Sequence, residues 1–177
     1  TGINADEGVQ VIMTTHSDNI SAASKISKMN ILKKENGYSR VIQPALGLHE
    51  NDVRHIERYL DSKRSELLFS KSVILVEGDA EEILIPVMCK KCLGLTLDEL
   101  GISLINIGSV GFKNIYQLFN PLRINKRCAV ITDMDEPIKP IGAGSQDNAH
   151  ERGKSRKAEL EKEHVDNVWV CLLYTSP

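Results

Sequence analysis

Two groups of carboxylates, each placed where a run of apolar residues ends, are the residues of this sequence best suited to chemistry. Ser72–Val76 gives way to Glu77, and Glu81 follows four residues later. A second apolar run gives way to Asp133 and Asp135. Such runs predict buried strands, and open α/β sheets carry their ligand-binding groups where strands end. Carboxylates are hard oxygen ligands that suit Mg²⁺ or Mn²⁺, and two such ions roughly 4 Å apart can act on the oxygens of a phosphodiester.

The spacing within each group allows its carboxylates to face one point. Gly78 permits a tight turn after Glu77, and Glu81 then falls one turn into a predicted helix. Asp133 and Asp135 are two residues apart, a spacing that keeps both side chains on one side of an extended segment. The competing interpretation is that the first group favours a helix N-terminus and that the second is a solvated turn. The order of both groups along one β-α-β-α-β pattern favours a metal site.

Alternating strands and helices predict an open parallel sheet that brings both groups to one edge. The expected strands are residues 72–76, 102–107, 127–132 and 167–170, and the expected helices are residues 80–93, 113–120 and 154–164. Right-handed crossovers place the carboxyl ends of parallel strands on one edge, so Glu77 and Asp133 should converge. The apolar residues that the first helix is expected to bury are Ile83, Leu84, Val87 and Met88.

The residues before this sheet predict a further set of elements. They are a strand over residues 9–14, a helix over 18–27, a hairpin of 29–34 and 38–43, and an amphipathic helix over 51–69 that a break near Asp61 and Ser62 can interrupt. His16 lies in a Thr-His-Ser turn between the first strand and the first helix. A histidine in this position either satisfies the local backbone or donates a hydrogen bond to a phosphoryl oxygen.

These residues resemble the Toprim domain, the metal-binding module of topoisomerases, bacterial primases and a group of nucleases. The similarity lies in Glu77-Gly-Asp-Ala-Glu81 followed by Asp133-Met-Asp135. Residues 61–81 and 97–108 further resemble the OLD (overcoming lysogenization defect) family. Members of that family are ATP-dependent endonucleases in which an ABC-type ATPase is joined to a C-terminal Toprim domain. The resemblance covers most of residues 10–170.

The resemblance implies an α/β fold in which a Toprim-like open parallel sheet with flanking helices follows the C-terminal strands and helix of an ABC-type ATPase domain. The implied segments are residues 1–45 for the end of the ATPase domain, 46–70 for a helical junction, 71–170 for a C-terminally truncated Toprim domain and 171–177 for a tail. Residues 171–177 look like a translated adaptor of transposon-based sequencing libraries. The biological sequence is therefore expected to stop near Val170.

The resemblance also implies roles for the candidate residues. Four carboxylates would be catalytic and would bind two Mg²⁺ or Mn²⁺ ions: Glu77, Glu81, Asp133 and Asp135. His16 would be the switch histidine that contacts the γ-phosphate of ATP. Three cations on the charged helix beyond the metal ligands are candidate DNA contacts, with a solvated helix face as the alternative: Lys154, Arg156 and Lys157.

The predicted function is that of a fragment of an ATP-gated, divalent-metal-dependent DNA endonuclease or nickase, with a role in phage defence or in repair left open. No phosphate-cradling loop precedes His16, and Gly153-Lys154-Ser155 does not complete one because position 148 is Asn. The fragment alone is therefore expected to be inactive. The alternative is a DNA-repair or recombination ATPase whose Toprim-like domain binds DNA or a partner without cleaving. The presence of all four carboxylates favours the enzyme.

Composition and charge limit the kinds of partner, cofactor and cellular location that the sequence predicts. The 177 residues carry a formal net charge of −2, so DNA contacts would need local basic patches. No apolar run is long enough for a membrane span and no signal-peptide pattern is present, so a cytoplasmic protein is expected. Cys89-Lys-Lys-Cys92 lacks the further ligands of a structural zinc site. By resemblance, a homo-oligomer formed through the ATPase domain is expected.

Overall fold

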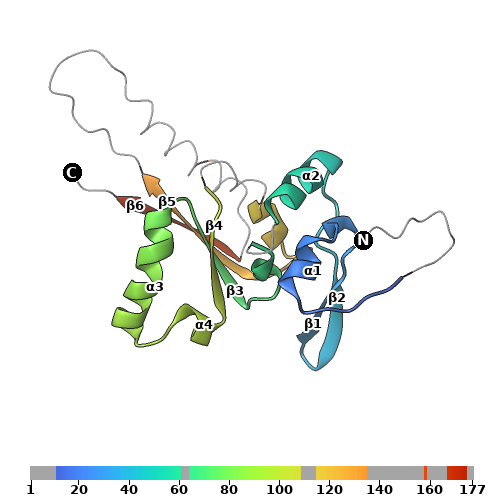
Figure 1. Ribbon diagram of the computed structural model, residues 1–177, viewed down its shortest axis with the longest axis horizontal. Helices are drawn as coiled ribbons and strands as arrows, with labels where there is room; N and C mark the ends of the chain where they lie inside the picture. The colour runs from blue at the N-terminus through green and yellow to red at the C-terminus, as the bar shows by residue number, and fades with distance from the viewer. Residues whose placement is uncertain (1–10, 61–63, 109–114, 135–157, 159–166, 175–177) are drawn as a thin grey trace, which may run out of the picture.

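The computed structural model describes residues 11–60, 64–108, 115–134, 158 and 167–174, and its described part is a mixed α/β fold. Figure 1 shows the larger sheet with α3 toward one end of the molecule and the β1–β2 hairpin with α2 toward the other. The elements are α1 (Asp18–Ala22), η2 (Ile26–Lys28), β1 (Ile31–Glu35), β2 (Tyr38–Ile42), α2 (Glu50–Tyr59), η3 (Arg64–Leu68), β3 (Ser72–Val76), α3 (Asp79–Leu93), α4 (Leu97–Leu100), β4 (Ile102–Asn106), η4 (Gln117–Phe119), β5 (Arg127–Met134) and β6 (Val168–Tyr174), where η marks a 3₁₀ helix.

The four-stranded sheet is parallel throughout, with the strand order β4-β3-β5-β6. Val76 at the end of β3 pairs with Asn106 on one side and with Ile131 on the other. The predicted α/β class with a parallel sheet and flanking helices is confirmed. Two strands are longer than expected, since β5 continues through Asp133 to Met134 and β6 continues to Tyr174. All four carboxyl ends therefore lie at one edge of the sheet.

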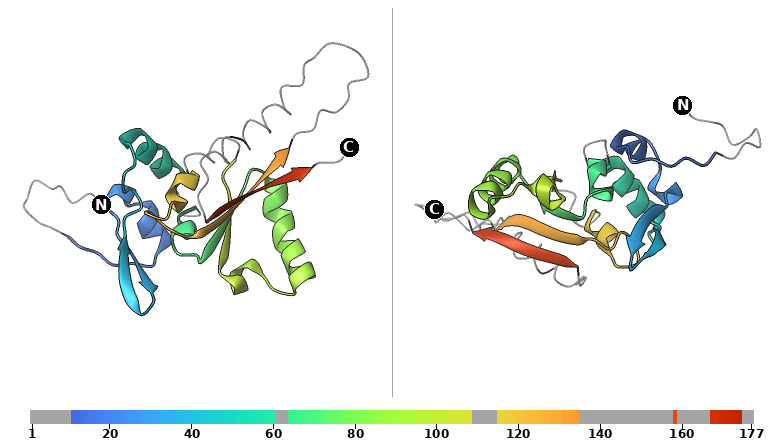
Figure 2. Two further views of the ribbon diagram at one scale, coloured as in Figure 1. Left: turned by 180° about the vertical axis from the view of Figure 1, so that it is seen from behind. Right: turned by 90° about the horizontal axis from the view of Figure 1, so that it is seen from below.

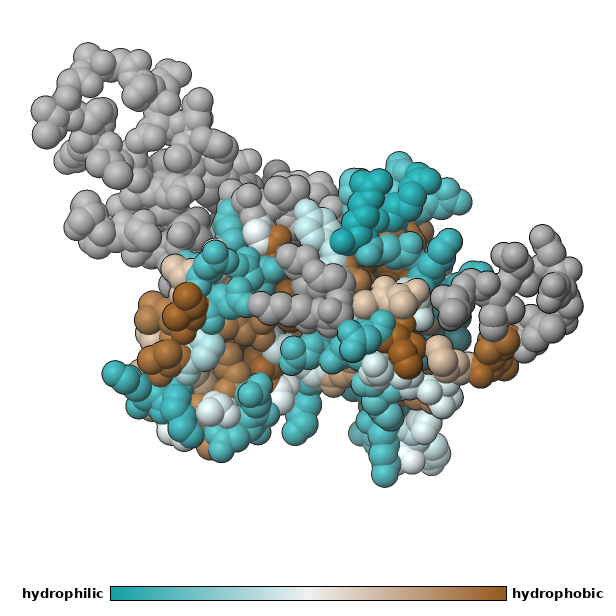
Figure 3. All heavy atoms as spheres, in the orientation of Figure 1, coloured by the Kyte–Doolittle hydropathy of each residue, from teal (hydrophilic) through white to brown (hydrophobic). Residues whose placement is uncertain are grey.

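Helix α3 lies over one face of the sheet together with α4, but it is rotated relative to the prediction (Figures 1 and 2). The four apolar residues expected to be buried are exposed, by 72% for Ile83, 55% for Leu84, 48% for Val87 and 51% for Met88. Apolar surface accordingly gathers over α3 in Figure 3. The half-buried residues are instead Glu81, Glu82, Ile85, Pro86 and Cys89. Two stripes of the helix are apolar, so its periodicity did not decide which one faces the sheet.

Residues 11–14 form no regular secondary structure, which corrects the strand expected over residues 9–14; residues 9 and 10 lie outside the described part. The side chains of Val11, Ile12 and Met13 are all exposed. A strand is stabilised by hydrogen bonds to a neighbouring strand, and no described residue pairs with this segment. The helix expected over residues 18–27 is also divided, into α1 and η2.

The predicted hairpin and the predicted helix break are both confirmed. Strands β1 and β2 pair antiparallel around Asn36 and Gly37, whose φ angles are 50° and 85°. Positive φ at both central residues is what a type I′ turn requires, and Asn-Gly provides it at low cost. The helix expected over residues 51–69 ends as α2 at Tyr59, and η3 follows from Arg64.

The hydrophobic core runs without interruption across the boundary expected near residue 70. Ile26 and Ile56, from the N-terminal elements, belong to the same buried cluster as Val73, Phe119 and Val130. Full burial of such a side chain stabilises a fold by about 1.5–3 kcal/mol, so the two parts stabilise each other. Among the described helices, none has both the length and the apolar character needed to cross a bilayer.

Lys126, just before β5, links the sheet to the N-terminal elements. Its Nζ donates hydrogen bonds to the carbonyl oxygens of Leu67 at 3.1 Å and Leu68 at 2.6 Å. Burial and, to a lesser extent, the positive charge of Lys33 together lower the pKa of Lys126 to about 8. The ammonium group is therefore held where its charged form is disfavoured relative to water.

We expect the free energy of unfolding to rise with pH through the titration of Lys126. In the folded chain this lysine loses its proton near pH 8, whereas in the unfolded chain it keeps it until about pH 10.4. Between these values the unfolded state binds more protons, so raising the pH favours folding, by up to about 2 kcal/mol. In urea unfolding at pH 7 to 10, the change in the free energy of unfolding with pH should be more positive in the wild type than in Lys126→Met; this difference cancels the effect of groups that both proteins share, such as the buried thiol of Cys128, whose pKa burial raises.

Lys91→Met provides the matched control, because Lys91 is an exposed lysine in the last turn of α3. This variant should keep the wild-type pH dependence. Equal pH dependence in Lys126→Met and the wild type would contradict the assignment.

Candidate acidic site at the end of β3

The turn between β3 and α3 carries the first group of carboxylates. Glu77 follows the last residue of β3, Gly78 is the N-cap residue of α3 with φ −129° and ψ 165°, and Asp79 begins the helix. A Cβ atom on Gly78 would lie only 2.7 Å from Oε2 of Glu81. The missing side chain of Gly78 thus makes room for the Glu81 carboxylate to fold back over the turn. The Glu81 carboxylate therefore lies beside Gly78, the residue that follows Glu77 in the chain.

Thr132 of β5 holds the Glu77 carboxylate from one side. Its Oγ1 donates a hydrogen bond of 2.5 Å to Oε2 of Glu77, and the threonine is only 1% exposed. The register explains this contact, because Val76 pairs with Ile131 and the next residues of the two chains are Glu77 and Thr132. A buried hydroxyl that donates to a carboxylate is a charge-assisted hydrogen bond, which fixes the orientation of the carboxylate.

Asn106 of β4 holds the other side of the same turn. Its Nδ2 donates a hydrogen bond of 2.7 Å to Oδ1 of Asp79, and its Oδ1 accepts one of 3.0 Å from the backbone N–H of Gly108. Gly108 has a φ of +62°, a conformation that favours glycine. The side chain of Asn106 therefore ties the first residue of α3 to the loop that leaves β4.

The second group of carboxylates is described only in part. The backbone of Asp133 lies in β5, directly after Thr132 and paired with Leu173 of β6. Its side chain, and the whole of Asp135, lie outside the described residues. Among the side chains that are described, no three His, Cys, Asp or Glu residues are grouped so that they could hold a metal ion. The structure thus places the Glu81 carboxylate beside Gly78 and the backbone of Asp133 at the edge of the sheet where Glu77 follows β3.

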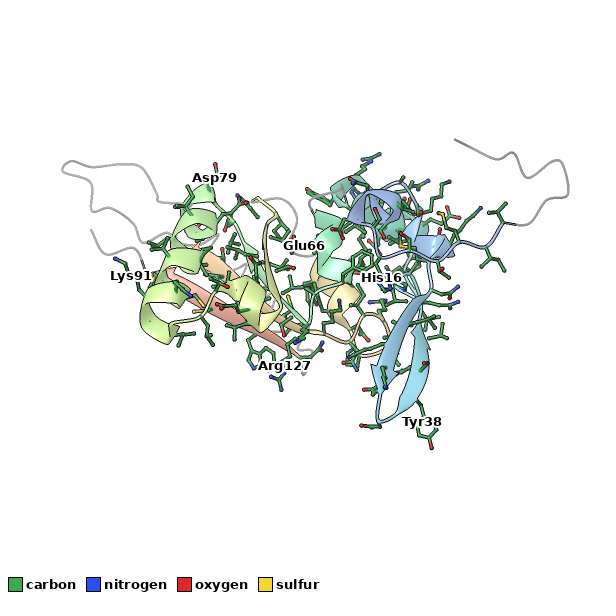
Figure 4. All side chains as sticks on the ribbon, turned by 60° about the horizontal axis from the view of Figure 1, so that its bottom comes forward. His16, Tyr38, Glu66, Asp79, Lys91 and Arg127 are labelled. Carbon is green, nitrogen blue, oxygen red and sulfur yellow. The ribbon has the colours of Figure 1, made fainter. Side chains whose placement is uncertain are left out.

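The remaining predicted residues lie elsewhere or outside the described part. His16 is exposed, and its ring packs against Phe69 with ring centroids 6.4 Å apart. In Figure 4, His16 and Glu66 lie in one half of the molecule and Asp79 lies in the other. His16 does not take part in the acidic turn. The three candidate DNA contacts lie outside the described residues: Lys154, Arg156 and Lys157.

Sequence reasoning missed Thr132 and Asn106 as site residues. Asn106 is the last residue of β4 and Thr132 lies two residues before the end of β5, and both direct a polar group at the acidic turn. A signal was present, because each is a polar residue at the point where an apolar strand ends, as Glu77 is. The identity of the partners depends on strand register, which the sequence did not provide.

Comparison with known proteins finds a matching family model and a similar protein. Residues 68–135 match the family model described as the Overcoming lysogenization defect protein-like TOPRIM domain. Over 148 residues, the chain is 26% identical to "Endonuclease GajA" of Bacillus cereus (strain HuB5-5). That alignment covers 75% of this chain and 21% of the relative, so the chain spans about a fifth of that protein.

Two solved structures are also similar. The C-terminal region of the OLD protein of Xanthomonas campestris pv. campestris is 25% identical with a TM-score of 0.39, and the match covers 60% of this chain and 52% of that chain. The C-terminal region of the Burkholderia pseudomallei OLD protein is 25% identical with a TM-score of 0.38, covering 58% and 54% of the two chains.

A substitution can test whether Gly78 is needed to make room for the Glu81 carboxylate or only to stabilise the fold. In Gly78→Ala the backbone is unstrained, but the new Cβ would displace the Glu81 carboxylate. We expect weaker Mn²⁺ binding with the free energy of unfolding changed by less than about 1 kcal/mol. Calorimetric titration with Mn²⁺ and urea unfolding of the chain would measure both quantities.

Gly94→Ala should show the opposite pattern. Gly94 ends α3 with a φ of 72° and has open space around it. Alanine in this conformation costs about 1 kcal/mol of stability, while the acidic turn is untouched. If Gly78→Ala lost stability and kept its Mn²⁺ affinity, the role assigned to this glycine would be wrong.

Proposed function

From the premise that residues 68–135 form a Toprim domain of the OLD-like family, we propose that the chain is part of an ATP-gated, divalent-metal-dependent DNA endonuclease or nickase. The observation that carries the proposal is the acidic turn after β3, in which Glu77 accepts a hydrogen bond from the strand that contains Asp133. Similarity to a protein named as an endonuclease supports the same activity.

The donor set of the turn suits a hard divalent cation. Glu77 and Glu81 supply carboxylate oxygens on both sides of Gly78, and Asp133 and Asp135 would complete a set of four. Oxygen ligands of this kind are those of Mg²⁺ and Mn²⁺. When bound, such ions lower the pKa of a water nucleophile and stabilise the charge that develops on the phosphodiester oxygens.

The residues of the chain contribute orientation and charge. Thr132 directs one oxygen of Glu77, so the other oxygen has a defined direction. The N-terminus of the fifteen-residue helix α3 lies at the turn, where its positive dipole end stabilises the carboxylates of the first turn. A DNA phosphate that approaches this edge would meet the same favourable dipole.

Cleavage of supercoiled plasmid by the longer protein that contains this chain tests the proposal. We expect Glu77→Gln and Asp133→Asn to reduce nicking in Mn²⁺ on the order of 100-fold, because each change removes an anionic oxygen ligand. Asp98→Asn is the matched control, since Asp98 is a carboxylate in the first turn of α4 rather than of the site. Wild-type nicking by either site variant would remove that carboxylate from the catalytic set.

The proposed contact of His16 with ATP predicts a separate effect. His16→Ala in the longer protein should lower the rate of ATP hydrolysis without changing Mn²⁺ binding by the acidic turn, because His16 packs on Phe69 and not on that turn. Hydrolysis is measured by phosphate release, with His49→Ala, a change at the N-cap position of α2, as the control. An unchanged rate in His16→Ala would contradict the switch role.

A further inference from the structure

We infer that Thr132 and Asn106 are positioning residues that hold the acidic turn from its two neighbouring strands. The inference rests on the proposed function, because it assigns these residues to the orientation of the metal-binding carboxylates. Neither residue is a predicted metal ligand. Each makes a side-chain hydrogen bond to the turn from a different strand, Thr132 from the end region of β5 and Asn106 from the end of β4.

The hydroxyl of Thr132 makes its hydrogen bond to Glu77 from a buried position. With 1% of its surface exposed, the side chain has little access to water. If valine replaced Thr132, the Glu77 carboxylate would lose this buried hydrogen-bond donor. Loss of a buried hydrogen bond costs more free energy than loss of an exposed one. The hydroxyl of Thr132 therefore restricts the rotation of Glu77 in a way that valine could not.

Asn106 contacts the first residue of α3, Asp79, which is not one of the predicted metal ligands. An amide is both donor and acceptor, and both functions are used, since Nδ2 binds Asp79 and Oδ1 binds the N–H of Gly108. Asp79 is the first residue of α3, and Glu81 lies two residues further along the same turn of helix. Fixing the position of Asp79 thus fixes the start of the helix that presents Glu81.

Together the two contacts attach the turn that follows β3 to both neighbouring strands. A turn between a strand and a helix usually moves more than the elements that it connects. Ligands must be held near their productive geometry for tight metal binding, and residues that hold them typically contribute 10-fold to 100-fold in affinity or activity. The metal affinity of the turn should therefore depend on two residues that do not bind the metal.

Calorimetric titration of the 177-residue chain with Mn²⁺ tests the assignment. We expect Thr132→Val and Asn106→Ala each to weaken Mn²⁺ binding about tenfold. Thr132→Ser, which retains the hydroxyl, should stay within about twofold of the wild type. This rescue by the conservative variant separates the hydroxyl from the bulk of the side chain.

Two matched controls separate positioning from general stability. Ser103 of β4 is 4% exposed and donates a hydrogen bond of 2.9 Å to Glu66, so Ser103→Ala removes a similar buried contact elsewhere in the same sheet. Asn120 accepts a hydrogen bond from the N–H of Leu122, so Asn120→Ala removes a comparable turn contact. Both controls should lower the urea midpoint as the test variants do and leave Mn²⁺ affinity unchanged.

Three results would overturn the inference: wild-type Mn²⁺ affinity in Thr132→Val and Asn106→Ala, equal weakening in the two controls, or no Mn²⁺ binding by the wild-type chain. The proposed function is judged separately, by whether plasmid nicking depends on Glu77 and Asp133. A protein that nicks DNA through these carboxylates and is indifferent to Thr132 and Asn106 would keep its function and lose only the positioning role.

Discussion

Parallel hydrogen bonding on both sides of β3 is the constraint on which the acidic turn depends. Val76 pairs with Asn106 of β4 and with Ile131 of β5, so the residues that follow Val76 meet the ends of both neighbours. The ladder is continuous from Ser72, and its inward side chains are buried in the core. A shift of register by one residue would turn every side chain of the strand to the opposite face. The positions of the side-chain oxygens in the turn are therefore determined by apolar packing several residues away.

The acidic turn holds several negative charges close together in the sequence. Glu77, Asp79 and Glu81 lie within five residues of sequence, and like charges at such short range repel each other. Donors from Thr132 and Asn106 and the dipole of α3 offset part of this repulsion.

The sequence was sufficient for the strands of the sheet and for the hairpin, because each depends on local signals. Apolar runs marked the strands, and Asn36-Gly37 marked the hairpin turn. The rotation of α3 was not predictable, since Ile83, Leu84, Val87 and Met88 form one apolar stripe while Ile85, Pro86 and Cys89 form another. The prediction of a strand over residues 9–14 was wrong because a periodic pattern does not reveal whether a partner strand is present. Thr132 and Asn106 were missed because their roles follow from pairing between distant residues.

The pairing of β3 with β5 has a consequence for how relatives can be recognised. A residue inserted inside β5 would shift Asp133 by one position along the strand relative to Val76. The side chains of β5 that follow the insertion would then point to the opposite face of the sheet. Residues inserted between β4 and β5 would only lengthen a connection, at an entropic cost that grows slowly with length. The distance of each carboxylate from its own strand is thus constrained by the strand pairing, whereas the length of the interval between the two groups is not. A search pattern with a fixed interval would overlook relatives that share this geometry.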